Sequence, residues 1–534
     1  MSKIETEIRN QNNYRCAVCG VAANNKCAAC SSVSYCSKQH QKSHWKVHKN
    51  ECICYEVLDD PRLGRHLASK RTINAEDIII RDDPLIVGPA FPTTEPVCIK
   101  CLRDLKKTPV VSLCEQCLWP VCPAECQPLK CLFSHRGTEC NVLARAAETV
   151  AKSNEYKYEI ITPLRCILLQ ITDKNDWRRF LQLQSHLSHR GPESEVYEEI
   201  NAICNHLKHT YLTTSELDSS AETIHKVCGI LDVNSVDVQL SGINLTAVYP
   251  VVSLLEHSCL PNIRLSFDEA GRACVYATRK INKGEHLSTM YTNALWGTRG
   301  RRAHLMATKY FSCNCTRCSS NTELGTHFST VICNAKDFCK GNLTPTDPLN
   351  DSSSWECDRC PTTVSSDRID TIIADLSLVV DEALQNPSIT LLEKTLEKLT
   401  NFVHSNHYLC FNIKHTLVQM YGHLPGYKHS KLSAELLERK SKLCREMFFV
   451  LNVIDPLYVR LNLYTSVVLH ELHQVLLETA NRMSKSQFES KGMIDEAKVL
   501  LLKALEMLEN EPDGSPGNKL LQAYKSSMDN SVFA

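Results

Sequence analysis

SLLEHSCLPN, at residues 253–262, and KYFSCNCTRC, at residues 309–318, are the most informative stretches of this 534-residue chain. The second stretch places three cysteines in a Cys-x-Cys-x2-Cys spacing. Three thiolates are one ligand short of a closed tetrahedral zinc site, so a fourth ligand must come from another part of the chain. Between the two stretches lies KGEHLSTMYT, at residues 283–292. The pattern predicts a zinc site that ties the second stretch to a distant segment.

The segments around these stretches differ in their periodicity. Residues 231–292 are rich in Val and Ile and carry several glycines, which predicts short strands and turns. Upstream, LGRHLASKRTINAEDIIIRDDPLIVGP, at residues 63–89, is typical of a strand pair opened by a glycine turn. Residues 141–228 contain few glycines and read as helical, and residues 368–521 repeat apolar side chains at three- and four-residue steps. We expect a helical array there.

Composition limits the class of protein. A chain of 534 residues is too long for one core and suggests three or four modules. Lys plus Arg and Asp plus Glu are both 60, so a globally basic nucleic-acid binder is not indicated. No apolar run is long enough to cross a membrane, and MSKIETEIRN is too polar for a secretory signal. We therefore expect a cytoplasmic or nuclear protein whose 29 cysteines stay reduced, so that pairs in Cys-x-x-Cys spacing indicate zinc sites rather than disulfides.

The first cysteine cluster offers eight soft ligands in four pairs, enough for two tetrahedral zinc sites. Its pairs are Cys16-x2-Cys19, Cys27-x2-Cys30, Cys36-x3-His40 and His48-x3-Cys52. His44 competes as a ligand, because it lies one helical turn from both His40 and His48. The alternative is a set of buried free cysteines.

The second cluster repeats this pattern in a later part of the chain. Its pairs are Cys98-x2-Cys101, Cys114-x2-Cys117, Cys122-x3-Cys126 and His135-x4-Cys140. Eight ligands in four pairs again suffice for two zinc sites, with Cys131 as an alternative ligand. Farther along, a ribbon-type site is predicted across the loop at residues 345–354, with the ligands Cys333, Cys339, Cys357 and Cys360.

The first cluster resembles the MYND zinc finger. In that family the pairs interleave, which implies one zinc on Cys16, Cys19, Cys36 and His40 and another on Cys27, Cys30, His48 and Cys52. The second cluster repeats the pattern, so the resemblance implies that its first pair shares a zinc with its third and its second pair with its fourth. His40 stands where the family usually has Cys, and imidazole is also a good zinc ligand. MYND fingers generally bind short proline-containing peptides, so the resemblance implies such peptides as partners.

HSCLPN, GEHLSTMY and CNCTRC together resemble a SET domain. Together with the finger, they make the chain similar to the SET-and-MYND (Smyd) methyltransferases. A second cysteine cluster inserted in the SET region resembles the arthropod SmydA-like branch of that family. The resemblance implies that Cys259 is the fourth ligand beside Cys313, Cys315 and Cys318. Cys259 is otherwise an ordinary buried thiol.

The resemblance also implies an S-adenosylmethionine site and a catalytic tyrosine. Tyr291 matches the tyrosine whose hydroxyl orients the target amine. The implied cofactor-binding residues are Arg65, Asn234, Ser253, Glu256, His257 and Phe311. In this chemistry the zinc ions, about six in all, are structural.

Three positions depart from the family pattern. Glu256 stands where the family usually has Asn, and a carboxylate cannot donate a hydrogen bond. His66 replaces the second glycine of a Gly-x-Gly turn. Lys309 occupies an expected tyrosine position, and Tyr310 is displaced by one residue. If this segment is a strand, that displacement turns the side chain to the other face.

The predicted fold class is α+β. We expect a SET β-fold with zinc-stabilised MYND-type fingers, a helical insertion and an all-α, helical-repeat-like C-terminal domain. The expected parts are a MYND finger (1–58), the N-terminal part of SET (59–97), a second MYND-like zinc insert (98–140), a helical SET insertion (141–230), core SET (231–312), a post-SET and zinc-ribbon segment (313–365) and the helical C-terminal domain (366–534).

The sequence favours one function over another. The first is an S-adenosylmethionine-dependent protein-lysine methyltransferase that acts on histone or non-histone protein, with a role in chromatin regulation. The alternative is a non-catalytic adaptor, a SET-shaped scaffold that binds proteins through its MYND fingers. Glu256 and Lys309 favour the adaptor, whereas Tyr291 and His257 favour the enzyme.

Overall fold

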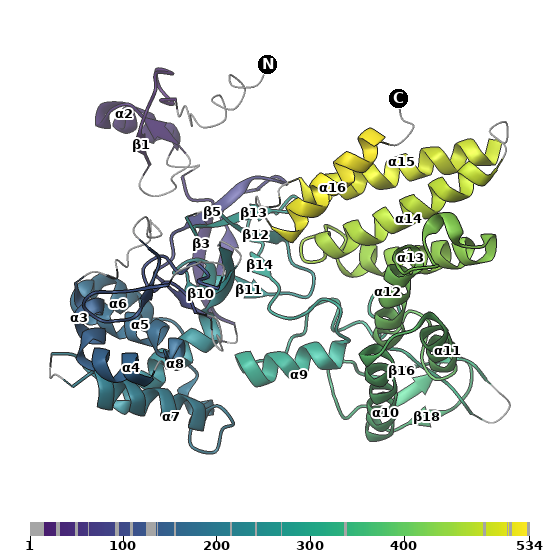
Figure 1. Cartoon of the computed structure of the whole chain (residues 1–534), viewed down its shortest axis with the longest axis horizontal. Helices are drawn as coiled ribbons and strands as arrows, with labels where there is room; N and C mark the ends of the chain where they lie inside the picture. Colours follow the sequence, from purple (N-terminus) through teal and green to yellow (C-terminus); the bar gives the residue numbers. More distant parts are fainter. Residues whose placement is uncertain are drawn as a thin grey trace. The chain divides into compact units, whose positions relative to one another are not determined.

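The computed structural model describes residues 15–27, 33–48, 52–61, 63–90, 96–106, 111–123, 135, 137–153, 156–213, 216–240, 243–268, 270–335, 339–483, 488–509, 511 and 515–530. Its contacts divide the chain into two compact units (Figure 1). Unit one lies within residues 1–256 and 262–288, and unit two within residues 257–261 and 289–534. The chain changes unit three times: inside the short strands β11 (Glu256–His257) and β14 (Ser288–Thr289), and between residues 261 and 262.

Unit one begins with a small finger. Strands β1 (Asn25–Lys26) and β2 (Ser34–Tyr35) pair antiparallel, and helix α2 (Lys38–His48) follows. The buried Tyr35 ring and the finger cysteines form its small core. A core this small cannot stabilise a module by itself, so the finger needs bound metal.

Two three-stranded antiparallel sheets form the centre of unit one. One has the order β12-β13-β5 and the other β6-β10-β9. The central strand β13 is almost wholly buried, and Ile263 pairs with Ala277 at its end. The strands of unit one are β3 (Tyr55–Asp60), β4 (Gly64–Ser69), β5 (Ile78–Asp82), β6 (Ile86–Pro89), β7 (Ser112–Leu113), β8 (Pro120–Val121), β9 (Val236–Leu240), β10 (Ile243–Val248), β12 (Ile263–Phe267) and β13 (Ala273–Ala277).

Helices α3 to α8 gather in another part of unit one (Figure 1). Helix α5 is buried along most of its length because it packs against strand β6 and helices α6 and α8. The helices are α3 (Thr138–Leu143), α4 (Ala147–Ser153), α5 (Ile161–Thr172), α6 (Lys174–Leu181), α7 (Tyr197–His206) and α8 (Ala221–Asn234), with the short helical turns η1 (Ala144–Ala146), η2 (Tyr158–Ile160), η3 (Leu187–His189), η4 (Leu207–Tyr211) and η5 (Val252–Leu254).

The boundary between helix and strand differs from the sequence-based expectation. Strands were expected from residue 231, but α8 continues to Asn234. Ile230 and Leu231 are buried on this helix, so apolar residues that suggested a strand instead complete a helical face.

The longer segment of unit two begins at Thr289, inside strand β14. Helix α9 (Thr298–Lys309) leads into the cysteine-rich stretch, and a four-stranded sheet of order β15-β16-β17-β18 follows. Its strands are β15 (Val331–Ile332), β16 (Asn342–Pro345), β17 (Trp355–Cys357) and β18 (Thr363–Val364).

Residues 309–311 do not form a strand. Lys309 is the last residue of α9, and Tyr310 is a left-handed helix cap with φ of 60°. This conformation is common just after a helix, although it favours glycine. A change of strand face therefore does not describe the displaced tyrosine.

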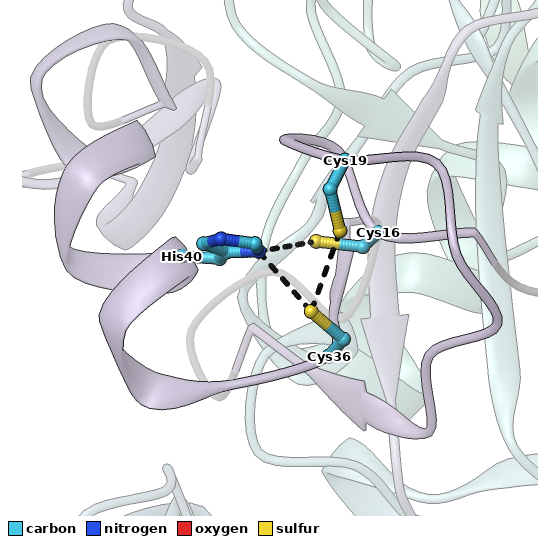
Figure 2. Close-up of side chains that lie close together, drawn as sticks. All are labelled: Cys16, Cys19, Cys36 and His40. Atoms are coloured by element: carbon cyan, nitrogen blue, oxygen red, sulfur yellow. Dashed lines mark hydrogen bonds between the residues drawn. The ribbon is translucent and has the colours of Figure 1, made fainter.

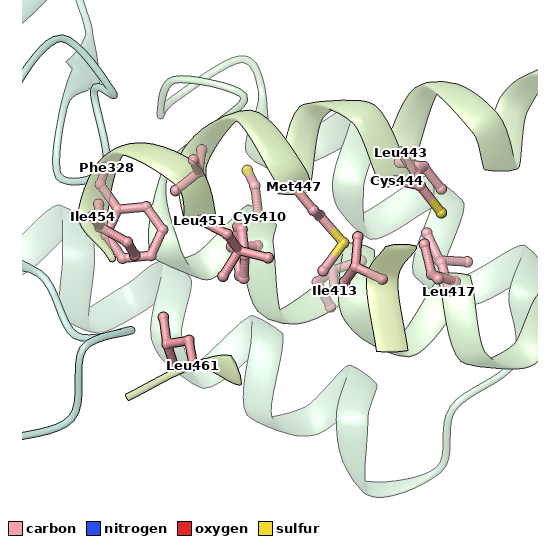
Figure 3. Close-up of a cluster of buried hydrophobic side chains, with 14 of the residues drawn as sticks. Phe328, Cys410, Ile413, Leu417, Leu443, Cys444, Met447, Leu451, Ile454 and Leu461 are labelled. Carbon is pink, nitrogen blue, oxygen red and sulfur yellow. The ribbon is translucent and has the colours of Figure 1, made fainter. Parts of the chain in front are cut away.

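A helical array completes unit two. Buried Leu, Ile, Val and Met side chains from several helices interdigitate around Cys410 and Cys444, as Figure 3 shows. The helices are α10 (Ser366–Gln385), α11 (Ile389–Leu399), α12 (Tyr408–His423), η6 (His429–Lys431), α13 (Ala434–Ile454), α14 (Asn462–Arg482), α15 (Phe488–Leu508) and α16 (Pro516–Asn530). Within the described ranges, no helix is both long and apolar enough to span a membrane.

Candidate functional site

The first finger brings together one complete set of predicted zinc ligands (Figure 2). His40 Nδ1 lies 3.4 Å from Cys16 Sγ and 3.1 Å from Cys36 Sγ, and the Sγ atoms of Cys19 and Cys36 are 3.5 Å apart. The four ligand atoms all lie within 4.8 Å of one another. Three sulfurs and one imidazole nitrogen at this separation fit tetrahedral zinc.

The other set of the finger is partly described. Cys27, His48 and Cys52 gather in the buried part of the finger, with the two sulfurs 3.5 Å apart. Cys30, the fourth predicted ligand, lies outside the described residues. His44, the competing ligand, places its Nδ1 3.0 Å from the Tyr35 hydroxyl.

The second cluster also contains a complete set. Cys114, Cys117, His135 and Cys140 are all buried and lie within 4.8 Å of one another. His135 Nε2 is 3.3 Å from Cys117 Sγ, so the imidazole reaches this set through Nε2. The four donors fit zinc.

The remaining set of the second cluster is partly described. Cys101 Sγ is 3.6 Å from Cys122 Sγ, and Cys98 Sγ accepts a hydrogen bond of 3.3 Å from the Cys122 amide. Cys126 and the alternative ligand Cys131 lie outside the described residues.

Unit two holds two further four-cysteine sets. Cys259, Cys313, Cys315 and Cys318 form one, and the Sγ atoms of Cys259 and Cys318 are 3.6 Å apart. The other set lies in the small ribbon sheet, with sulfur pairs at 3.7 Å and 3.6 Å; its members are Cys333, Cys339, Cys357 and Cys360.

A buried arginine contacts the set around Cys259. Arg301 Nε donates to Cys259 Sγ at 3.2 Å, and its Nη1 donates to Glu323 at 2.9 Å. Burial alone would raise the pKa of Glu323, but Arg301 and Arg317 lower it to about 2. The guanidinium therefore faces thiolates on one side and an ionised carboxylate on the other. Sequence reasoning missed this arginine, although the chain places it in the helix just before the cysteines.

Tyr291, His257 and Phe311 lie together in unit two. The ring centroids of Tyr291 and His257 are 5.4 Å apart, those of His257 and Phe311 5.9 Å, and those of Tyr291 and Phe311 6.5 Å. Lys309 Nζ lies 6.0 Å from the centre of the Tyr291 ring. The arrangement is an aromatic cluster that attracts a cation.

His257 connects this aromatic cluster to the cysteine set. Its Nδ1 accepts a hydrogen bond of 3.0 Å from the Tyr291 amide, and its Nε2 lies 3.3 Å from Cys259 Sγ. Burial lowers the pKa of His257 to about 4, so the ring is neutral at physiological pH. Because Nδ1 accepts, the proton resides on Nε2 and points toward the sulfur.

In unit one, Asn234 and Ser253 lie together. Asn234 Nδ2 donates to the carbonyls of Gln184 and Ile230, both at 2.7 Å. Ser253 Oγ donates to the Asn234 carbonyl at 3.2 Å. The amide nitrogen of Asn234 is thus engaged within its own unit.

The other predicted residues of unit one also have partners. Arg65 donates to the Gln182 carbonyl. Glu256 Oε2 lies 2.9 Å from His286 Nδ1, and the rings of His286 and His66 are 4.4 Å apart. The two departures from the family pattern, Glu256 and His66, therefore meet at one histidine. The GEHL stretch contained that histidine, but nothing in its spacing pointed to Glu256.

Comparison with known proteins identifies two domains. A family model for the MYND finger matches residues 16–52, and a SET domain model matches residues 46–292. The SET domain-containing protein SmydA-8, isoform A, of Drosophila melanogaster is 27% identical over 307 residues, covering 56% of this chain and 63% of that protein. Histone-lysine N-methyltransferase ASHR1 of Arabidopsis thaliana is 26% identical, covering 65% of this chain and 73% of that protein.

The match to the relatives is partial. Histone-lysine N-methyltransferase SMYD3 of Mus musculus is 24% identical, covering 51% of this chain and 63% of that protein. The chain thus spans less than two thirds of the length of SmydA-8 and SMYD3. A solved structure of the SET domain of LSMT bound to lysine and AdoHcy aligns with 91% of this chain at 12% identity and a TM-score of 0.28.

Proposed function

Because the chain belongs to the SET-and-MYND (Smyd) family and is similar to its SmydA members, we propose that it is an S-adenosylmethionine-dependent protein-lysine methyltransferase. The observation that carries this proposal is the cluster of Tyr291, His257 and Phe311 beside the Cys259 set. Aromatic rings suit the passage of a lysine side chain, and the adjacent tyrosine hydroxyl suits its amine.

In this mechanism the protein mainly positions the reactants. S-adenosylmethionine supplies the methyl group when it is bound. The Tyr291 hydroxyl accepts a hydrogen bond from the target amine and holds its lone pair in line. His257 holds the Tyr291 backbone through Nδ1 and is itself oriented by the sulfur of Cys259. A closed zinc site thereby fixes the catalytic tyrosine without taking part in the chemistry.

The proposed cofactor contacts are those that the resemblance to the Smyd family implies. We assign Arg65, Asn234, Ser253, Glu256, His257 and Phe311 to them. Polar groups of the first four suit the amino acid and ribose parts of the cofactor, and the Phe311 ring suits a flat or sulfonium group.

The zinc content follows from the ligand sets. We propose about six ions, with Cys30 completing the second site of the first finger and Cys126 the first site of the insert. Support comes from four complete sets and from the partly described groups. The division into seven parts given by the sequence is part of the same proposal.

The remaining proposals concern partners and place of action. The substrate is a histone or non-histone protein with a target lysine. The MYND finger binds proline-containing peptides of other proteins, and the protein acts in the cytoplasm, the nucleus or both.

A catalytically inactive adaptor is the second candidate. The contact between Glu256 and His286 favours it, because a carboxylate engaged by an imidazole replaces an amide that would otherwise be free to donate. Lys309 near the Tyr291 ring favours it too, because its ammonium occupies space and adds charge where a substrate amine would be expected.

Methyl labelling separates the two candidates. The full chain is incubated with a cell lysate and tritiated S-adenosylmethionine, and the proteins are hydrolysed to amino acids. The enzyme predicts labelled methyl-lysine that is absent without the added chain. An adaptor predicts no labelled lysine above that background.

A further inference from the structure

A buried ionic chain lies behind the insert site formed by Cys114, Cys117, His135 and Cys140. The carboxylate of Glu139 contacts His135 on one side and the guanidinium of Arg165 on the other. Both Glu139 and Arg165 are only 3% exposed. Buried charges of this kind are costly unless they are fully paired, so their positions are specific.

The two ring nitrogens of His135 face different partners. Nε2 lies 3.3 Å from Cys117 Sγ, inside the ligand set, and Nδ1 lies 3.1 Å from Glu139 Oε1. A carboxylate accepts a hydrogen bond from Nδ1–H, which keeps the proton on Nδ1 and leaves the Nε2 lone pair free for a metal. The contact therefore selects the tautomer that a metal needs.

Arg165 anchors the carboxylate to the body of unit one. Its Nε and Nη2 donate to the two Glu139 oxygens at 2.8 Å and 3.1 Å. Its Nη1 donates to the Val87 carbonyl of strand β6 at 2.7 Å, and Nη2 also donates to the Ile99 carbonyl at 3.0 Å. The guanidinium thus joins the carboxylate to a strand of the SET sheet and to the loop between Cys98 and Cys101.

We infer that Glu139 is the outer-sphere carboxylate of this zinc site. We also infer that Arg165 links the site to strand β6, so that the strand is more rigid when the site is ordered. Neither residue is a metal ligand; both are positioning residues. The inference rests on the zinc proposed at this set of ligands. The insert would then stabilise the sheet, because contacts run from His135 through Glu139 and Arg165 to the strand.

Zinc release measures the first half of the inference. Native mass spectrometry counts the ions on the full chain as a function of time after a chelator is added. Glu139→Gln keeps the size of the side chain but loses the charge, and one ion should leave about 10- to 100-fold faster than from the wild type. The matched control is Glu148→Gln on the next helix, where the carboxylate is 86% exposed, and its release should equal that of the wild type.

A double-mutant cycle separates positioning from general loosening. His135→Cys retains a metal ligand but removes the imidazole that Glu139 orients. In that background, Glu139→Gln should change the release rate by less than about twofold, because the interaction between the two residues is already absent. The same acceleration in both backgrounds would overturn the outer-sphere role.

Hydrogen exchange measures the second half. Removal of this zinc, or Glu139→Gln, should speed exchange of the amides in β6 and in its partner β10, whereas Glu148→Gln should not. Should Glu139→Gln fail to fold, Glu139→Gln with Arg165→Met removes both charges and leaves no lone buried ion. If the amides of β6 exchange at the same rate after loss of the ion, the proposed link from the zinc site to the strand is wrong.

The test also distinguishes failure of the zinc site from failure of the inference. If Cys117→Ser and the wild type carry equal numbers of ions, the zinc proposal fails and the inference falls with it. If the wild type carries one ion more than Cys117→Ser, but Glu139→Gln releases it at the wild-type rate, the inference alone is overturned.

Discussion

At the scale of single residues, His257 links the proposed catalytic tyrosine to the cysteine set around Cys259. It contacts the Tyr291 amide through one ring nitrogen and the Cys259 sulfur through the other. The neutral imidazole can serve both contacts only in one tautomer. The orientation of the proposed catalytic tyrosine therefore depends on a thiolate that lies 32 residues earlier in the chain.

Tyr291→Phe tests the role of the hydroxyl directly. The ring contacts with His257 and Phe311 remain, so the fold and the binding of S-adenosylmethionine should change little. Loss of one oriented hydrogen-bonding group should lower kcat by at least about 100-fold. Steady-state methyl transfer and calorimetric cofactor binding, measured on the same preparation, check the two halves; equal activity of the variant and the wild type would exclude Tyr291 as the catalytic residue.

Predictability at this scale depended on distance along the chain. The ligand pairs of the finger were predictable because each knuckle places its two ligands within a few residues, and the family resemblance supplied the way in which the pairs combine. Arg301, Glu139 and the Glu256–His286 contact were not, because each joins groups that the fold brings together from elsewhere. An i, i+4 spacing of His135 and Glu139 was the one local signal for such a contact.

At the scale of elements, two helices of the array are joined by a buried ion pair. Lys440 of α13 is fully buried and contacts Glu471 of α14 and the Tyr421 carbonyl. His423 Nε2 lies 2.8 Å from the other Glu471 oxygen. Although burial alone would raise the pKa of Glu471, contacts with His423 and Lys440 lower it to about 2.

Lys440→Met should destabilise the array strongly. It leaves Glu471 buried without its main counter-charge, at a cost of about 3 to 5 kcal/mol in the free energy of unfolding at pH 7. Lys440→Met with Glu471→Gln should recover much of that loss, because no uncompensated charge remains. Urea denaturation followed by circular dichroism measures both variants, and equal stability of the single and double variants would contradict the account.

The same pair predicts a pH dependence. Because the folded pKa of Glu471 lies below its usual value of 4.5, its stabilising contribution is present above about pH 4.5 and is lost as the pH falls toward 2. Glu471→Gln should therefore reduce the fall in stability of the array between pH 5 and pH 3. Urea denaturation midpoints of the variant and the wild type at these pH values measure this difference. If stability falls equally in both, Glu471 is not the source of the pH dependence.

The elements themselves were predicted unevenly. Apolar residues at three- and four-residue steps correctly indicated α11 and α15, where Leu392, Leu396, Leu501 and Leu508 are buried. Residues 309–311 lie at the end of a helix, and the sequence left a strand open there because short apolar and aromatic runs do not distinguish the two.

At the scale of the whole molecule, the proposed zinc sites and the helical array occupy different stretches of the chain. The zinc ligand sets described above lie between Cys16 and Cys360. The last 174 residues contain only two cysteines, Cys410 and Cys444, and both pack in the apolar core of the array (Figure 3). This division followed from the uneven distribution of cysteines along the chain, whereas the pairing of the strands required the structure.

Chelation should therefore unfold part of the molecule. After removal of zinc, peptides from the finger and the insert should lose protection against hydrogen exchange, because such small modules lack sufficient cores. Peptides from α10 to α16 should remain protected. Addition of excess zinc with the chelator is the control, and uniform loss of protection along the chain would contradict the division.

The central claim, that the chain is an S-adenosylmethionine-dependent methyltransferase, is tested most directly by titration calorimetry of the full chain with S-adenosylmethionine. A methyltransferase should bind S-adenosylmethionine at one site with a Kd in the micromolar range, about −8 kcal/mol. An adaptor has no need of this ligand. Absence of binding by zinc-loaded, folded protein at millimolar cofactor would contradict the methyltransferase and leave the adaptor.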